Sequence, residues 1–118
     1  MTEELNVSTE PIDDGSVIIS LSGRFMAGDA ESVKDIFIRV VNGQEMDVVV
    51  DMAEVPFIDS AGLSALVSGL KHVRGSGGNM VLAAVQPQTL TVFTLTMLDQ
   101  VFTIYPDRQT ALAQIAEI

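Results

Sequence analysis

The residues of this chain most suited to chemistry lie together at Asp59 and Ser60, where a carboxylate is followed directly by a hydroxyl. They follow a buried apolar run at residues 47–51 and a connection that contains Pro56, and they precede an amphipathic segment. Serine or aspartate at a helix start accepts hydrogen bonds from the first free amides, which is one interpretation of the pair. A serine there is also suited to carry a phosphate, because the unpaired N–H groups and the helix dipole favour negative charge. The residues alone leave both interpretations open.

A hydrolase is a further candidate, because Ser60, His72 and Asp59 have the residue types of a nucleophile, a base and an orienting acid. However, the helix between Ser60 and His72 separates them by about 18 Å at roughly 1.5 Å per residue, far beyond hydrogen-bond reach. We therefore predict that the protein is not an enzyme and has no catalytic residues. The same argument makes His72 an ordinary surface residue.

The composition argues against metal and cofactor sites. The chain has no cysteine, and its single histidine cannot form a histidine cluster. The acidic residues lack the spacing of an EF-hand calcium loop. The glycine-rich segment at residues 75–78 follows a predicted helix and precedes a predicted strand, the reverse of the order in a phosphate-binding loop. We predict no cofactor and no metal.

Charge and hydropathy exclude two classes of partner. Sixteen acidic and six basic residues give the 118-residue chain a net charge of −10, which would repel a nucleic-acid backbone. The first residues are acidic, whereas a signal peptide begins with basic residues and then an apolar run. The longest apolar runs, such as residues 80–85, are far shorter than the roughly 18 residues of a membrane-spanning helix. We expect a soluble cytoplasmic protein that binds neither nucleic acid nor membrane directly.

The elements that position Asp59 and Ser60 alternate between strand and helix patterns. Two short strands around a turn at residues 13–16 predict an N-terminal β-hairpin. Three further strands are predicted at residues 47–51, 80–85 and 101–105. Helical spacing of apolar residues predicts four helices, at residues 29–41, 63–74, 87–97 and 107–118. The order ββαβαβαβα predicts a single α/β domain over residues 1–118, with a mixed, mostly parallel sheet.

The segment Val55-Pro-Phe-Ile-Asp-Ser-Ala-Gly-Leu63 resembles the signature of STAS domains, the family of anti-sigma factor antagonists. The resemblance extends over nearly the whole chain. Gly23-Arg-Phe25 is similar to the turn after the second strand of that family, and residues 51–55 to the third strand and its exit. Residues 78–83 and 98–105 resemble the fourth strand and the entry to the fifth. The resemblance implies a STAS-like domain.

In the family that this segment resembles, the serine after the aspartate is phosphorylated by an anti-sigma factor with serine kinase activity. The unphosphorylated antagonist binds that kinase and frees a sigma factor, the phosphorylated form releases it, and a phosphatase resets the cycle. By position, the resemblance implies that Ser60 is the phosphorylation site. It implies a partner-binding surface formed by Asp59, Ser60, Ala61, Gly62 and Leu63, although Leu63 also belongs to the apolar face of its helix.

Two positions depart from the family pattern. Met26 occupies a place where family members often carry an aspartate, in a loop that tends to lie near the acceptor serine, so the phosphorylation rate or the choice of kinase could differ. Ser64 stands where glycine is common, and it is a minor rival acceptor one helical turn after Ser60. The resemblance also leaves open an alternative function, a non-switching STAS subunit of a lipid-transport or stress-sensing complex.

Overall fold

The computed structural model describes residues 5–117, which begin with a two-stranded hairpin. Strand β1 (Asn6–Asp13) pairs antiparallel with β2 (Ser16–Ser22). In the turn between them, the carboxylate of Asp13 accepts hydrogen bonds from the backbone N–H of Gly15 at 2.9 Å and from the hydroxyl of Ser16 at 2.8 Å. Because these bonds favour the ionised form, they lower the pKa of the Asp13 carboxyl.

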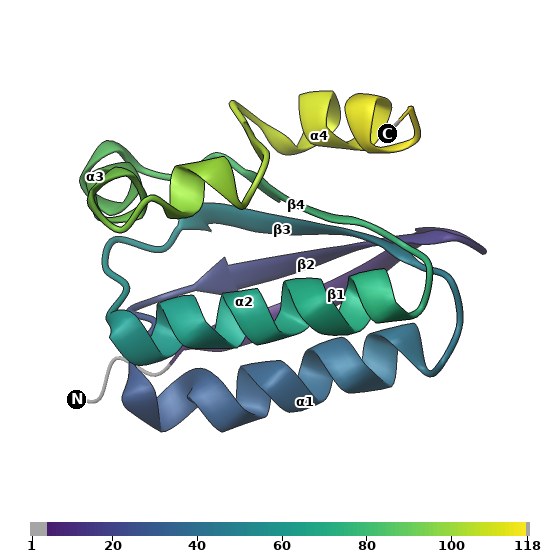
Figure 1. Ribbon diagram of the computed structural model, residues 1–118, viewed down its shortest axis with the longest axis horizontal. Helices are drawn as coiled ribbons and strands as arrows, with labels where there is room; N and C mark the ends of the chain where they lie inside the picture. The colour runs from purple at the N-terminus through teal and green to yellow at the C-terminus, as the bar shows by residue number, and fades with distance from the viewer. Residues whose placement is uncertain (1–4, 118) are drawn as a thin grey trace.

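Three parallel strands extend the hairpin into a five-stranded sheet with the order β1-β2-β3-β4-β5 (Figure 1). They are β3 (Asp47–Glu54), β4 (Met80–Ala83) and β5 (Ile104–Tyr105). Consecutive residues of β3 and β4 are buried, as expected for strands that are covered on both faces. The structure therefore confirms the predicted α/β fold and its mixed, mostly parallel sheet.

The helices cover the two faces of the sheet unequally (Figure 1). Helices α1 (Ala30–Val41) and α2 (Ser60–Gly75) lie together on one face, over the larger hydrophobic core. Helix α4 (Arg108–Ile115) lies on the other face, over β3, β4 and β5. Helix α3 (Pro87–Leu95) follows β4 at the end of the sheet where α2 begins. None of the helices in residues 5–117 is both long and apolar enough to span a membrane.

The last predicted strand is shorter in the structure than the sequence indicated. Only Ile104 and Tyr105 pair as β5, and a 3₁₀ turn, η2 (Leu98–Gln100), precedes them. The backbone N–H groups of Val101 and Phe102 both donate to the carbonyl of Leu98, which keeps this segment out of the sheet. Phe102 is buried against Phe93 and contributes to the core from a turn. A short apolar run therefore did not distinguish a turn from a strand, and of its residues only Phe102 is buried.

Candidate functional site

Asp59 is the N-cap of α2 and connects that helix to a neighbouring segment. Its Oδ1 accepts a hydrogen bond from the backbone N–H of Gly62 at 2.9 Å, and its Oδ2 accepts one from Ala27 at 3.0 Å. The backbone of Asp59 is extended, as an N-cap requires. Ala27 begins a 3₁₀ turn, η1 (Ala27–Asp29), so one carboxylate joins η1 to α2. The sequence offered Asp59 and Ser60 as capping residues, and the structure assigns the cap to Asp59.

The loop after β2 crosses directly beside the start of α2. Phe25 forms an isolated parallel bridge with Ile58. The backbone N–H of Phe25 donates to the carbonyl of Phe57 at 2.9 Å, and the N–H of Asp59 donates to the carbonyl of Phe25 at 3.1 Å. Met26 lies between Phe25 and Ala27, which are both hydrogen-bonded to Asp59. The methionine that stands where family members often carry an aspartate is therefore next to the candidate site.

Ser60 is the first residue of α2, and it is exposed. Within residues 5–117 its hydroxyl makes no hydrogen bond, whereas both oxygens of the neighbouring Asp59 are engaged. The backbone N–H groups of Ser60 and Ala61 have no acceptor in that range either, as expected for the first turn of a helix. The geometry would therefore place a phosphate on Ser60 at the positive end of the helix dipole, near two free donors. Ser64, the rival acceptor, is also exposed.

Two residues of the predicted partner-binding surface are turned into the protein. Leu63 is only 6 % exposed and belongs to the hydrophobic core. Gly62 is buried, and a Cβ at this position would lie 2.7 Å from Cγ1 of Ile58 and 2.8 Å from the carbonyl oxygen of Phe25. Gly62 thus allows the loop after β2 to approach α2 closely. Neither Gly62 nor Leu63 offers a side-chain surface to a partner, while the half-buried Ala61 is partly accessible.

Exposed apolar side chains lie on the segments that are bonded to the helix start. Phe57 is 41 % exposed and Met26 is 37 % exposed. The guanidinium carbon of Arg24 lies 5.0 Å from the centroid of the Phe57 ring, within the range of a cation–π interaction. Sequence reasoning assigned no binding role to Phe57 or Arg24, because loop residues have no periodicity that separates exposed from buried side chains.

His72 is not the ordinary surface residue that the sequence predicted. It is half-buried, and its Nε2 atom is buried with no hydrogen-bond partner among residues 5–117. With Lys34, Ile38 and Gly69 it lines a small cavity of about 160 Å³ between α1 and α2. The reason is its place on the helix, because His72 follows the buried Gly69 by three residues and so lies beside the buried face. Nowhere in residues 5–117 do three or more His, Asp or Glu side chains form a group that could hold a metal.

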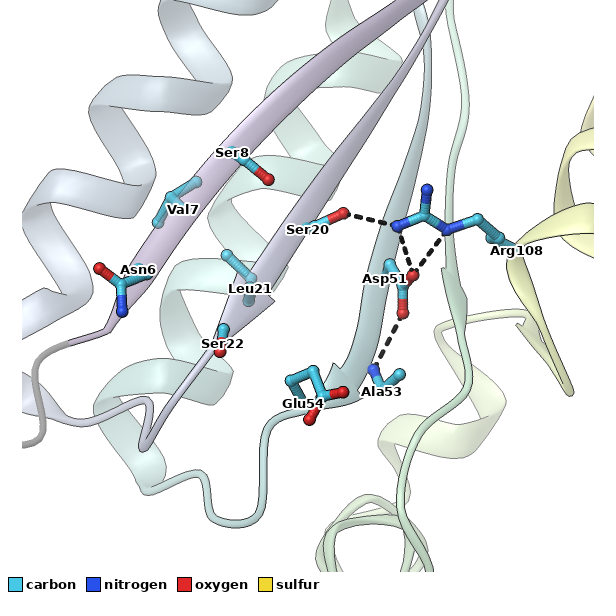
Figure 2. A pocket seen from close by; sticks show the side chains of 10 residues that line it. All are labelled: Asn6, Val7, Ser8, Ser20, Leu21, Ser22, Asp51, Ala53, Glu54 and Arg108. Atoms are coloured by element: carbon cyan, nitrogen blue, oxygen red, sulfur yellow. Dashed lines mark hydrogen bonds and ion pairs between the residues drawn. The ribbon is translucent and has the colours of Figure 1, made fainter.

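A charged cluster that the sequence did not reveal lies on the other face of the sheet (Figure 2). Nε and Nη2 of Arg108, in α4, each lie 2.8 Å from Oδ2 of Asp51, in β3. Nη2 also donates to the hydroxyl of Ser20, in β2, at 2.9 Å. Arg108 is 57 positions from Asp51 and 88 from Ser20, so no local pattern could pair them. Oδ1 of Asp51 accepts from the backbone N–H of Ala53 at 2.9 Å.

Similarities to known proteins extend over most of the chain. The family model described as the STAS domain matches residues 8–111. The chain is 29 % identical over 100 residues to "Putative anti-sigma factor antagonist BtrV" of Bordetella bronchiseptica, a match that covers 85 % of this chain and 86 % of BtrV.

Solved structures with the same fold cover almost the whole chain. The crystal structure of an anti-sigma factor antagonist from Mycobacterium paratuberculosis matches with a TM-score of 0.84 at 26 % identity, over 96 % of this chain and 95 % of that one. SpoIIAA of Bacillus in its unphosphorylated form matches with a TM-score of 0.82 over 96 % of this chain and 98 % of its own. At 16 % identity, the likeness to SpoIIAA is one of fold alone.

Proposed function

This chain belongs to the STAS domain family, and on that basis we propose that it is an anti-sigma factor antagonist. BtrV and the similar structure from Mycobacterium paratuberculosis are described in those terms. The protein works by binding an anti-sigma factor in the cytoplasm, so that a sigma factor is set free. Its role is regulatory and requires no catalysis by this chain.

The observation that carries the proposal is the exposed hydroxyl of Ser60 at the start of α2, which has no hydrogen-bond partner in the part of the chain that the structure describes. In the proposed cycle, the anti-sigma factor acts as a serine kinase on Ser60, and a phosphatase removes the phosphate. Because Asp59 caps the helix, the Ser60 hydroxyl can be modified without the loss of a capping bond. The structure of SpoIIAA, which has the same fold, has also been solved in a phosphorylated form. This supports the proposal that the fold can carry a phosphate.

The proposed docking surface is the exposed part of the helix start and the loops bonded to it. Ser60 lies at its centre, with the partly accessible Asp59 and Ala61 beside it. The exposed side chains of Met26 and Phe57 add apolar area at its edge. Gly62 and Leu63 belong to this surface only indirectly, since they fix the position of the helix start from inside the protein.

The charge added by phosphorylation is large enough to release a partner. A phosphoserine carries about −1.5 to −2 charges at neutral pH. Two like charges about 4 Å apart cost roughly 1 kcal/mol in bulk water and about 4 kcal/mol at the effective dielectric of a protein surface. A loss of about 2.8 kcal/mol weakens binding about a hundredfold. A partner that covers the site would take the phosphate and the Asp59 carboxylate out of water, where their repulsion is small, into a lower dielectric, where it is larger. This increase in repulsion and the desolvation of the phosphate both weaken binding, so release needs no refolding.

Phosphorylation in vitro followed by mass mapping tests the proposal. The wild-type chain and the variants Ser60→Ala and Ser64→Ala are incubated with ATP and candidate anti-sigma kinases. We expect a single phosphate on Ser60, which is absent from Ser60→Ala and retained in Ser64→Ala. Phosphate on any other residue would overturn the site assignment. Recovery of a transporter ATPase by affinity purification, with no phosphorylation by any anti-sigma kinase, would favour the non-switching alternative.

A further inference from the structure

A hollow of about 270 Å³ lies in the part of the sheet face that α4 leaves uncovered (Figure 2). Strands β1, β2 and β3 form its floor, and Arg108 reaches over it from the first turn of α4. The hydroxyls of Ser8, Ser20 and Ser22 are among the groups that line it. The same face of β2 carries Ile18 where α4 covers the sheet. At the hollow these hydroxyls and the carboxylate of Glu54 stand among apolar surface, a combination typical of small-molecule sites.

Arg108 is not available to an incoming anion. Two of its nitrogens are bonded to Asp51 and one of these also to Ser20, while Nη1 lies 3.6 Å from Oε1 of Glu10. All three guanidinium nitrogens therefore face oxygen atoms of the protein. Asp51, only 9 % exposed, is compensated by Arg108 in return.

Glu54 leaves the hollow with an excess of negative charge. Its carboxylate forms no ion pair or hydrogen bond with any residue in the range 5–117, and the residue is exposed at the end of β3. In that range the hydroxyls of Ser8 and Ser22 also have no hydrogen-bond partner. An ammonium or guanidinium group would supply donors to these acceptors and a charge opposite to that of Glu54. A carboxylate or phosphate would be repelled by Glu54, and the described residues that line the hollow offer it no free cation.

We infer that this pocket is a binding site for a small organic cation, an aliphatic amine or guanidinium compound. The cationic group binds at Glu54, and the aliphatic part of the ligand lies along the floor, where the hydroxyls of Ser8, Ser20 and Ser22 stand among apolar surface. The pocket is on the sheet face opposite α2, so it is separate from Ser60 and does not depend on the proposed phosphorylation.

Titration of backbone amide NMR signals tests the assignment with three probes that are each built on a four-carbon chain. Agmatine is the cationic probe, butane-1,4-diol the neutral one and succinate the anionic one. We expect agmatine alone to cause saturable shifts, grouped at Ser20, Ser22 and Ala53. Equal shifts with the diol or with succinate would overturn the proposal. So would agmatine shifts that spread over the acidic surface and do not saturate.

Two charge-matched variants separate binding in the pocket from general attraction to an acidic chain. Glu54→Gln and Glu45→Gln each remove one exposed carboxylate, and Glu45 is outside the pocket. We expect Glu54→Gln to raise the apparent Kd for agmatine about fivefold or more, and Glu45→Gln to leave it within about twofold. An independent variant, Ser22→Val, should weaken binding without any change in charge. Equal effects of the two Glu variants would overturn the proposal, as would unchanged binding in both Glu54→Gln and Ser22→Val.

Discussion

Asp59 and Ser60 divide two tasks between adjacent residues. The Asp59 carboxylate bonds to Gly62 and Ala27 and fixes the helix start, which leaves the Ser60 hydroxyl free at the surface. A modification that used the capping residue itself would disturb α2. In this arrangement, the chemistry of the switch and the stability of the helix can therefore be changed separately by substitution.

The substitution Ser60→Asp places a permanent negative charge where the phosphate would be. We expect affinity for the anti-sigma partner to fall about tenfold or more, because a charge beside Asp59 must be covered by the interface. Far-UV circular dichroism should be nearly unchanged, since the Ser60 hydroxyl takes no part in the cap. Calorimetric titration measures the affinity, and Ser60→Ala should bind like the wild type. Equal affinity of Ser60→Asp and the wild type would refute the electrostatic account of release.

Removal of the Asp59 carboxylate tests the other task. Asp59→Ala deprives the N–H groups of Gly62 and Ala27 of their acceptor, and we expect the free energy of unfolding to fall by about 1–2 kcal/mol. Asp59→Asn keeps one side-chain oxygen and should lose less. Urea denaturation monitored by circular dichroism gives both values. If the alanine variant were as stable as the wild type, the proposed link between η1 and α2 would contribute nothing measurable.

Gly62 should be intolerant of even one additional carbon. A Cβ there would lie within 3.0 Å of both Ile58 and the backbone of Phe25, so we expect Gly62→Ala to destabilise the protein by about 1–3 kcal/mol. Gly28 provides a matched control in the neighbouring 3₁₀ turn, since a Cβ there would meet no atom within 4 Å. Gly28→Ala should stay within about 0.5 kcal/mol of the wild type in the same urea experiment. Similar losses in the two variants would show that close packing at Gly62 is not the cause.

At the scale of elements, α4 is held to the sheet by few buried apolar residues. Ala111 and Ile115 are the buried residues that it places on the sheet, and Arg108 adds the ion pair with Asp51. Arg108→Gln leaves an almost buried carboxylate without its cation, and we expect a loss of about 1–3 kcal/mol, reduced from the fully buried case because Arg108 is partly exposed. A double-mutant cycle with Asp51→Asn isolates the pair. Strictly additive losses would show that the two side chains are not coupled.

The N-cap of α4 makes the stability of this element depend on pH. The carboxylate of Asp107 accepts a hydrogen bond from the backbone N–H of Thr110 at 2.7 Å, which lowers the pKa of Asp107 below its ordinary value of 3.8. A carboxyl whose folded-state pKa is lowered stabilises the fold above the ordinary value, and this contribution disappears as the pH falls through the folded-state pKa. We expect the stability difference between the wild type and Asp107→Asn to shrink between about pH 5 and pH 2. Urea denaturation across that range measures it, and a constant difference would contradict the prediction.

Local sequence patterns predicted the elements whose neighbours in space are mostly neighbours in the chain. The apolar run of β3, the amphipathic α2 and the Asp59 cap were all predictable in this way. Contacts between residues far apart in the chain could not be predicted in this way. They account for the burial of Gly62 and for the ion pair of Arg108, neither of which the sequence indicated. Gly62 is buried because of Phe25, and Arg108 finds Asp51 across the fold.

The net charge of −10 acts on the whole molecule rather than at any one site. Among the acidic side chains of residues 5–117, ion pairs are formed only by Glu10, Glu31 and Asp51, with Lys34 or Arg108 as the basic partner. Folding brings these like charges closer together than they are in the extended chain, so their mutual repulsion opposes the folded state. Salt should weaken this repulsion, because the Debye length falls from about 30 Å at 0.01 M to about 8 Å at 0.15 M.

We therefore expect the melting temperature at neutral pH to rise as sodium chloride is added over this low range of concentration. Near pH 4, where many carboxylates are protonated, the same addition should have a much smaller effect. Scanning calorimetry at both pH values separates screening of the net charge from salt effects on apolar hydration, because the latter do not depend on carboxylate ionisation. A fall in melting temperature with salt at neutral pH would contradict the prediction and would mean that attractive pairs such as Arg108 with Asp51 outweigh the general repulsion.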